Sequence, residues 1–144
     1  KPETQAARDR GVLFDVGHGV ASFNFNTARA AFSQGFVPDV ISTDLHQANI
    51  DGPVYSLPVT MDKMLALGIS LPDCVEKVTA APAKYFAMKD LGKLKAGYLA
   101  DITVFHLEDG EYQFADADGN SLTGTTSIRP DYAIVGGVVQ MERR

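Results

Sequence analysis

The chain has 144 residues, 45% of them hydrophobic, which is enough apolar content for the core of one ordinary domain. A net charge of −5 with scattered Lys and Arg argues against a nucleic-acid partner, because such binders gather basic residues on one face. No apolar run approaches the roughly 18 residues of a membrane span, so we expect no membrane partner. The single cysteine, Cys74, excludes an internal disulfide and favours a reducing, cytoplasmic location.

The first part of the chain predicts a strand, a helix and a second strand. Val12–Val16 is typical of a mostly buried strand, and Gly17-His18-Gly19 breaks it. Asn26 or Thr27 is expected to cap the following helix. The second strand, Val40–Ser42, is joined to the first by short links, which is typical of a parallel pair with a right-handed crossover.

Helices are predicted after the loop that follows the second strand. One covers about Thr60–Leu67, and Ser70 is placed to cap the next helix. Pro82 interrupts the helical pattern, and a short helix is expected over Ala83–Met88. Cys74 falls among apolar neighbours in the second of these helices, so we expect a buried and inert thiol there.

The character of the chain changes after Asp90. Ile102–Leu107 and Tyr112–Phe114 are expected to be separate strands. Gly136-Gly137, between Tyr132–Val135 and Val138–Met141, is a strong two-residue hairpin signal. We therefore divide the chain into an α/β part, residues 1–90, and a β-rich part, residues 91–144.

Two polar groups follow the two predicted parallel strands. They should face the same mouth, which is the opening at the carboxyl ends of these strands. His18 comes after the first strand, and Asp44 comes after the second. In parallel α/β sheets functional side chains gather at the carboxyl ends of strands, where a carboxylate can bind a cation and move a proton. The loop after Asp44 forms one wall of this mouth, to which Asn49 contributes either a contact or only shape.

Each of these residues also has a structural interpretation. Asp44 could cap a helix or bond within its loop, and His18 could bond a backbone carbonyl inside a tight turn. In the same interpretation His46 faces away from Asp44 into the loop, and Asp15 is an interior, hydrogen-bonded carboxylate. We interpret His106 as structural, because no metal-ligand pattern is spaced around it in the sequence.

A partial dinucleotide-binding motif competes with this interpretation. Gly17-His18-Gly19 follows a strand, and Asp44 lies near the position of a ribose-binding acid. Ser22 replaces the third glycine, and the segment before the helix delays its start. No helix N-terminus is therefore expected close to the glycines, where a pyrophosphate would need it.

Five segments of the chain form a familiar series in this order: Phe14–Gly19, Gly35–His46, Val78–Ala83, Leu91–Phe105 and Arg129–Gly137. Together they resemble the end of the barrel, and the following β domain, of the amidohydrolase superfamily. The resemblance is to the dihydroorotase-like metal-dependent hydrolases and deacetylases, and it covers nearly the whole chain in order. It implies an α/β fold: the last two strands and helices of a (β/α)8 TIM barrel followed by part of a small β-sandwich domain.

The resemblance also implies a chemistry. Members bind one or two zinc ions through a His-x-His pair, usually a carboxylated lysine, two more histidines and an aspartate on the last barrel strand. Only the aspartate maps onto this chain, as Asp44, which would ligate the metal and pass a proton from the attacking hydroxide to the departing nitrogen. His18 would end the seventh strand and contact substrate or polarise its carbonyl. Asn49, from the loop after Asp44, is the second candidate for a substrate contact, independently of the resemblance.

The chain departs from the family pattern in its size and in its histidines. It holds three histidines and no His-x-His, whereas a barrel of this kind needs roughly 250 residues. Two barrel strands cannot close on themselves. We therefore expect the missing N-terminal barrel portion, a small-molecule substrate and further copies in a homo-oligomer as partners, and we expect the chain alone to be inactive.

Three hypotheses follow from the sequence. The leading one is a fragment of a zinc-dependent hydrolase that cleaves an amide, cyclic amide or ester bond, with Asp44 as metal ligand and proton shuttle. The second is a dinucleotide-binding domain that uses Gly17–Gly19. The third is a non-catalytic interaction module in which the polar strand ends only cap loops.

Overall fold

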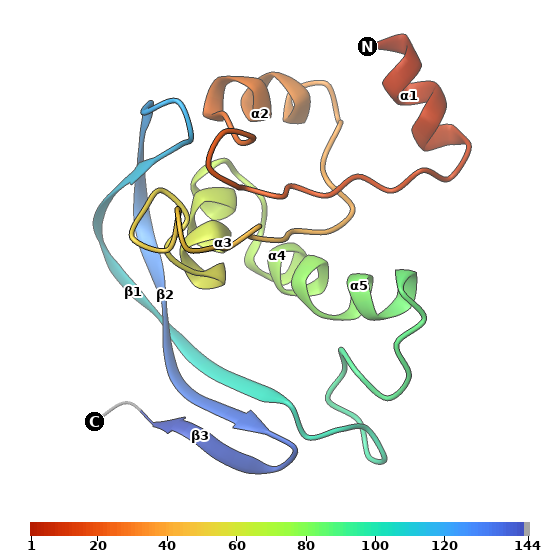
Figure 1. The fold of residues 1–144 in the computed structure, drawn as a ribbon, viewed down its shortest axis with the longest axis vertical. Helices are drawn as coiled ribbons and strands as arrows, with labels where there is room; N and C mark the ends of the chain where they lie inside the picture. Colours follow the sequence, from red (N-terminus) through yellow and green to blue (C-terminus); the bar gives the residue numbers. More distant parts are fainter. Residues whose placement is uncertain (143–144) are drawn as a thin grey trace.

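The computed structural model describes residues 1–142, in which five helices precede an antiparallel sheet of three strands (Figure 1). In chain order the elements are α1 Pro2–Asp9, α2 Phe25–Phe32, α3 Leu57–Ala66, α4 Leu71–Val78, α5 Ala80–Tyr85, β1 Ile102–Ala115, β2 Ser121–Val135 and β3 Val138–Glu142. The chain is therefore α/β, as expected. None of the helices within residues 1–142 is long and apolar enough to cross a membrane.

The two predicted N-terminal strands lie parallel, but the pairing is short. Asp15 and Val40 form a single parallel bridge, and the Val16 amide donates to the Val40 carbonyl at 3.3 Å. The outer residues Val12 and Leu13 are 48% and 42% exposed. The parallel direction of the prediction is confirmed, while its full-length strands are wrong, because a pair with few lateral partners makes few ladder hydrogen bonds.

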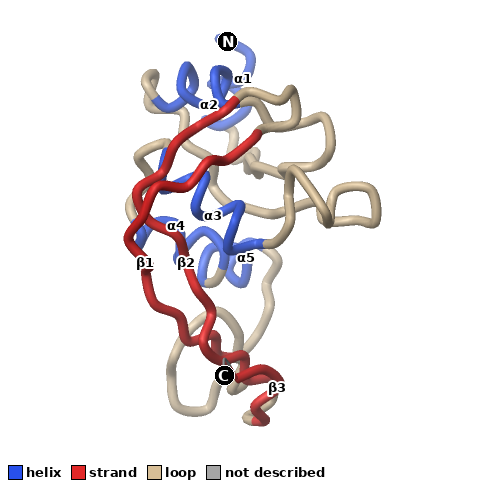
Figure 2. The backbone as a smooth tube through the Cα atoms, turned by 90° about the vertical axis from the view of Figure 1, so that its left-hand side faces the viewer, coloured by secondary structure: helices blue, strands red, loops and turns tan. Residues whose placement is uncertain are grey.

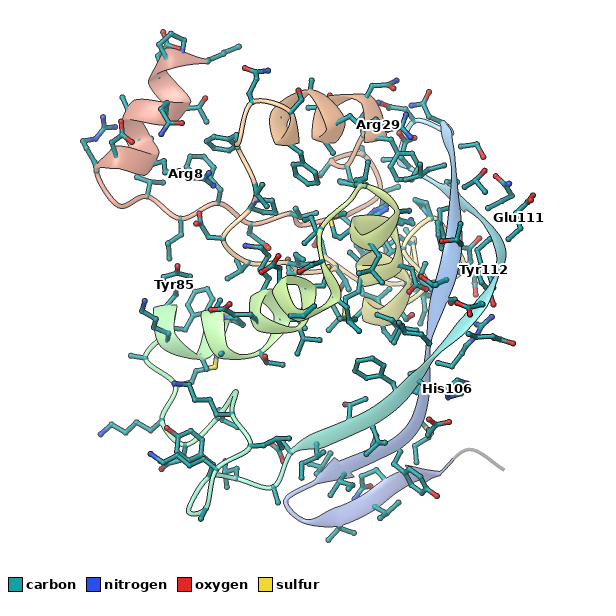
Figure 3. All side chains as sticks on the ribbon, turned by 180° about the vertical axis from the view of Figure 1, so that it is seen from behind. Arg8, Arg29, Tyr85, His106, Glu111 and Tyr112 are labelled. Carbon is teal, nitrogen blue, oxygen red and sulfur yellow. The ribbon has the colours of Figure 1, made fainter. Side chains whose placement is uncertain are left out.

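Helix α1 was not anticipated from the sequence. It is fastened by Arg8, whose guanidinium donates to the Val37 carbonyl at 2.6 Å and pairs with Asp39 at 3.3 Å. The same group lies 3.9 Å from the centre of the Phe36 ring, a cation–π distance. Figure 3 shows Arg8 beside α1, at the side of the molecule away from the β1–β2 hairpin.

The caps of the next helices are only partly as predicted. Asn24, not Asn26 or Thr27, caps α2, and its side chain accepts from the Thr27 amide at 2.9 Å. The prediction was wrong because Phe25 starts the helix, one residue before Asn26. Ser70 caps α4 as expected.

Two predictions about the later elements are wrong in their bounds. Helix α5 begins at Ala80 instead of Ala83, because Pro82 is tolerated in a first turn. Strand β1 continues from Ile102 to Ala115, with an irregular register between Asp109 and Tyr112, where two separate strands were expected. The Gly136-Gly137 turn between β2 and β3 is confirmed.

The long β1–β2 hairpin runs along the helices and packs against α3 (Figure 2). A single cluster of buried apolar residues joins the two parts, with members including Phe25, Met61, Met64, Phe114, Leu122 and Ile128. Asp62 of α3 reinforces the contact, because its carboxylate accepts from the Ser127 hydroxyl and the Ile128 amide, both at 2.8 Å. The regions expected to be two domains therefore share one core.

Candidate functional site

Asp44 lies just beyond the carboxyl end of the parallel bridge. Past Asp15 and Val40, the His18 and Gly19 amides donate to the carbonyls of Ser42 and Thr43, at 3.4 and 3.1 Å. The backbone of Gly17–Gly19 thus runs beside the segment that leads into Asp44. The structure brings His18 and Asp44 to neighbouring positions, as the strand order predicted.

The backbone at Asp44 is in the left-handed region, with a φ of 48°. This conformation is uncommon outside glycine, although Asp tolerates it better than most residues. The carboxylate is exposed and lies over Gly19: a Cβ added at Gly19 would sit 2.9 Å from Asp44 Oδ2. Gly19, whose own φ is +56°, therefore leaves the room that the carboxylate occupies.

Asn49 organises the loop after Asp44. Its side-chain amide donates to the Asp44 carbonyl at 2.8 Å, and its Oδ1 accepts from the His46 amide at 2.8 Å. The Asn49 side chain is fully buried. His46 is exposed, and its Nδ1 accepts from the Ala48 amide at 3.2 Å. Both polar atoms of the Asn49 amide are engaged within the loop, so its predicted substrate contact stays a prediction.

His18 is fully buried and uses both ring nitrogens. Nδ1 lies 2.9 Å from the Gly19 carbonyl, and Nε2 lies 2.8 Å from Nζ of Lys63. Its ring also packs 4.8 Å from the ring of Phe23. Burial lowers the pKa of His18, and the neighbouring Lys63 charge lowers it further. A neutral ring with two internal partners contacts substrate only if it rearranges, so that predicted role also stays a prediction.

Lys63 was missed by the sequence analysis. Its amine, fully buried in α3, also donates to the Pro53 carbonyl at 2.6 Å. Burial lowers its pKa to about 8, against the attraction of the Asp116 charge. The signal that could have found it is its position four residues from both Val59 and Leu67, on an apolar helix face.

Asp116 was missed as well. It lies in the β1–β2 turn and accepts from the Phe25 amide at 2.9 Å, which places its carboxylate at the N-terminus of α2. The amides of Asp118 and Asn120 also donate to it. Although burial acts to raise its pKa, these hydrogen bonds lower it overall. Contacts 91 residues apart in the chain leave no local pattern in a sequence.

This capping removes the physical basis of the dinucleotide hypothesis. A pyrophosphate would need the free amides at the start of a helix after the glycine turn. The first turn of α2 begins six residues beyond Gly19, and Asp116 and Asn24 already bond its amides. A carboxylate held there would also repel a phosphate.

The remaining candidates make contacts within the fold. Asp15 accepts a short hydrogen bond from the Ser42 hydroxyl and so ties the parallel pair together. His106, on the hairpin in Figure 3, lies 2.8 Å from Asp131 on the facing strand. The sequence did not predict an acidic partner for His106, because only the strand pairing brings Asp131 to it. Cys74 is fully buried, and burial raises its thiol pKa to about 11, as an inert role requires.

Within residues 1–142 no three His, Cys, Asp or Glu side chains gather in a way that could hold a metal ion. Asp44 is an exposed oxygen donor of the kind that zinc accepts. A catalytic zinc site needs about three protein ligands, and the described residues do not bring such a set together.

Comparison with known proteins agrees with the resemblance in the sequence. A family model described as a deacetylase-like composite domain matches residues 94–140. A deacetylase of Enterococcus faecalis is 40% identical over 134 residues, which are 92% of this chain and 36% of that protein. Two solved structures, described as an adenine deaminase and a dihydroorotase, superpose with TM-scores of 0.96 and 0.86, at 38% and 34% identity.

The extent of these matches fits the expectation of a fragment. The two structural matches cover 99% and 96% of this chain but only 39% of each neighbour. The chain thus spans a little over a third of the length of the relatives that it matches. Over nearly its whole length it is related to the deacetylase- and dihydroorotase-like proteins of the amidohydrolase superfamily.

Proposed function

We propose that Asp44 is a metal ligand and the proton-transfer carboxylate of a zinc-dependent hydrolase that cleaves an amide, cyclic amide or ester bond. One observation carries the proposal. Asp44, four residues beyond the parallel bridge and with left-handed backbone, presents an exposed carboxylate over a glycine that leaves room for it. Uncommon backbone conformations persist only where the surrounding structure holds them in place, and they gather at functional sites.

The proposal includes the architecture around Asp44. Residues 1–90 would form the last two strand–helix units of a (β/α)8 barrel, and residues 91–144 would form part of the small β domain. The parallel bridge, the crossover through α2 and the relatives' names support this assignment. In such a barrel the catalytic side chains come from the carboxyl ends of the strands, where Asp44 lies.

The chemistry follows from what Asp44 can do. A zinc ion, when bound, would act as a Lewis acid: it would polarise the scissile bond and lower the pKa of bound water towards neutral pH. Asp44 would hold the ion through one carboxylate oxygen, accept a proton from the attacking water on its other oxygen and deliver that proton to the departing nitrogen or oxygen. One or two ions fit this role equally, and the other ligands would lie in the missing N-terminal portion.

His18 and Asn49 have their proposed places in the same site. Both lie beside the Asp44 backbone, and both are buried and internally bonded. We therefore propose that they shape the substrate pocket from behind, with direct contact to substrate as an additional role that needs their rearrangement.

Asp44→Asn in the full-length polypeptide that carries this sequence tests the function. Turnover is measured on an acetylated amide, an acetyl ester, dihydroorotate and adenine, which span the reactions in the relatives' names. We expect a loss on the order of a thousandfold, because the Asn amide cannot take up a proton. Asp51→Asn, an exposed aspartate of the same loop, is the control and should stay within about twofold.

Two results would contradict the proposal. Near-normal turnover of Asp44→Asn on a substrate that the unmodified protein hydrolyses would remove Asp44 from the mechanism. Protein purified without zinc, and inactive on all four probes after zinc is added, would instead favour the non-catalytic interaction module.

A further inference from the structure

Lys63 occupies an unusual place for a lysine. It is fully buried at the centre of α3, where the five consecutive residues Thr60–Met64 are all buried. Lysine is almost never fully buried unless it is paired, because taking its charge out of water is costly. Helix α3 packs against β2, and Lys63 reaches from it to the loops of the candidate site.

The hydrogen bonds of His18 fix the direction of the Lys63 contact. The Gly19 carbonyl, 2.9 Å from Nδ1, can only accept, so Nδ1 carries the ring proton. Burial keeps the ring neutral, which leaves Nε2 as an acceptor. Lys63 Nζ, 2.8 Å away, is therefore the donor, and it donates a second time to the Pro53 carbonyl.

These two acceptors belong to the two loops that surround Asp44. His18 lies in the Gly17–Gly19 turn, over which the Asp44 carboxylate sits. Pro53 lies in the loop after Asp44, which Asn49 fastens to the Asp44 carbonyl. The buried Lys63 amine thus connects the two loops on either side of Asp44.

We propose that Lys63 is a positioning residue for the Asp44 site: its amine joins the Gly17–Gly19 turn to the loop that follows Asp44, and so holds the backbone on both sides of the carboxylate. This inference rests on the proposed function of Asp44. It gives His18 a defined part as well, as the acceptor through which the glycine turn is held.

A purely stabilising role explains Lys63 less well. A buried charge of this kind is a weak source of stability, and well-packed apolar residues often replace such groups without loss. The lowered pKa of Lys63 reports the same cost, which Asp116 only partly offsets. A residue that costs stability and yet connects two functional loops is typical of a site that gives up stability for function.

Lys63→Met tests the inference, with Lys77→Met as a matched control. Lys77 Nζ also donates to a proline carbonyl, that of Pro38 at 2.6 Å, but Pro38 precedes the parallel bridge and belongs to neither of the two loops. Both variants are made in the full-length polypeptide. Three quantities are compared: turnover on the substrate found among the four probes, amide hydrogen exchange in the two loops, and the 15N spectrum of the His18 ring.

We expect Lys63→Met to keep the fold and its zinc content while turnover falls on the order of a hundredfold, since a small misplacement of a catalytic group has about that cost. Exchange should rise in both loops together, and the His18 signals should move away from the Nδ1–H tautomer. Lys63→Arg, which keeps the charge and the donors, should restore part of the turnover. Lys77→Met should change none of the three quantities.

The outcomes separate this inference from the proposed function. Unchanged exchange, an unchanged His18 spectrum and turnover within about twofold in Lys63→Met would overturn the inference even if Asp44→Asn is inactive. Loosened loops in Lys63→Met together with a fully active Asp44→Asn would instead overturn the proposed function. If Lys63→Met does not fold, Lys63→Gln, which keeps an N–H donor without the charge, takes its place with the same readouts.

Discussion

Asp62 and Lys63 are neighbours on α3, and both are buried, yet they serve different parts of the molecule. Asp62 faces the sheet, where two donors of β2 bond its two carboxylate oxygens. Lys63 faces the loops around Asp44 and bonds two acceptors there. Successive residues of a helix point about 100° apart, so one turn of α3 holds a structural contact on one side and the candidate site on the other.

The two sides differ in how they are held together. The seam between α3 and the hairpin combines apolar burial with hydrogen bonds, through residues such as Met64, Leu122 and Ile128. The mouth, formed by Gly17–Gly19 and the loop after Asp44, is held together by polar contacts. It contains Asp44 and Tyr55, both at positive φ, and it leaves the Asp44 carboxylate exposed. We infer that the seam supplies stability and that the mouth gives up part of it for function.

Breaking the seam should produce the largest change in stability. Asp62→Ala leaves the Ser127 hydroxyl and the Ile128 amide buried without their acceptor, which should lower the free energy of unfolding by about 3 kcal/mol. Asp62→Asn can still bond both groups and should cost less than about 1 kcal/mol. Denaturant unfolding measures the difference, and equal losses for the two variants would show that the hydrogen bonds do not hold the seam.

Filling the space between Gly19 and Asp44 with a side chain should lower turnover more than it lowers stability. Gly19→Ala places a Cβ 2.9 Å from Asp44 Oδ2, so we expect turnover to fall about a hundredfold. Gly35→Ala is the matched control, because Gly35 also has a positive φ but no atom lies within 4 Å of its added Cβ. Both variants should lose about 1 kcal/mol from the strained φ. Equal turnover in the two variants would show that Asp44 does not need the space left by the missing side chain of Gly19.

The pH dependence of stability distinguishes Lys63 from its neighbours. Its pKa in the folded chain, about 8, is below the ordinary 10.5, so the unfolded chain holds more protons across this interval. The stability contribution of this group therefore rises with pH, by about 2 kcal/mol between about pH 7 and pH 9.5. The pKa values of His18 and Asp116 are both lowered, so neither group titrates there.

Unfolding curves of the unmodified protein and of Lys63→Met, recorded at both pH values, measure this contribution. The gap between the two proteins should shift in favour of the unmodified one as pH rises. A gap that is independent of pH would mean that Lys63 is solvated like an ordinary surface lysine.

The smallest expected effect concerns Cys74, on the core side of the comparison. Its thiol is fully buried with a pKa of about 11, so little thiolate exists at neutral pH. A thiol reagent should label the native protein at least about a hundredfold more slowly than the unfolded protein. Rapid labelling of the native chain would show that the region around α4 opens readily.

Local signals in the sequence were sufficient for part of the fold. The Ser70 cap, the Gly136-Gly137 turn and the parallel order of the first two strands follow from neighbouring residues or from periodicity, and all three are confirmed. The first eleven residues of β2 were missed, because Gly124 and Pro130 are poor strand formers that the hairpin tolerates through pairing with β1.

The residues of the candidate site also divide into those that the sequence predicted and those that it did not. Asp44 and His18 could be placed together from strand order alone. Lys63 and Asp116 could not, because a lysine in a helix is ordinarily exposed and the bond from Phe25 to Asp116 spans 91 residues. The sequence therefore predicts which polar groups lie together at the strand ends better than it predicts what holds them in place.

The location of zinc tests the central claim most directly. We propose a crystal structure of the zinc-loaded full-length polypeptide, with anomalous scattering collected at the zinc edge. The account predicts a zinc peak about 2.0–2.2 Å from a carboxylate oxygen of Asp44. A fully loaded and active protein whose zinc lies beyond coordination distance of Asp44 would contradict it.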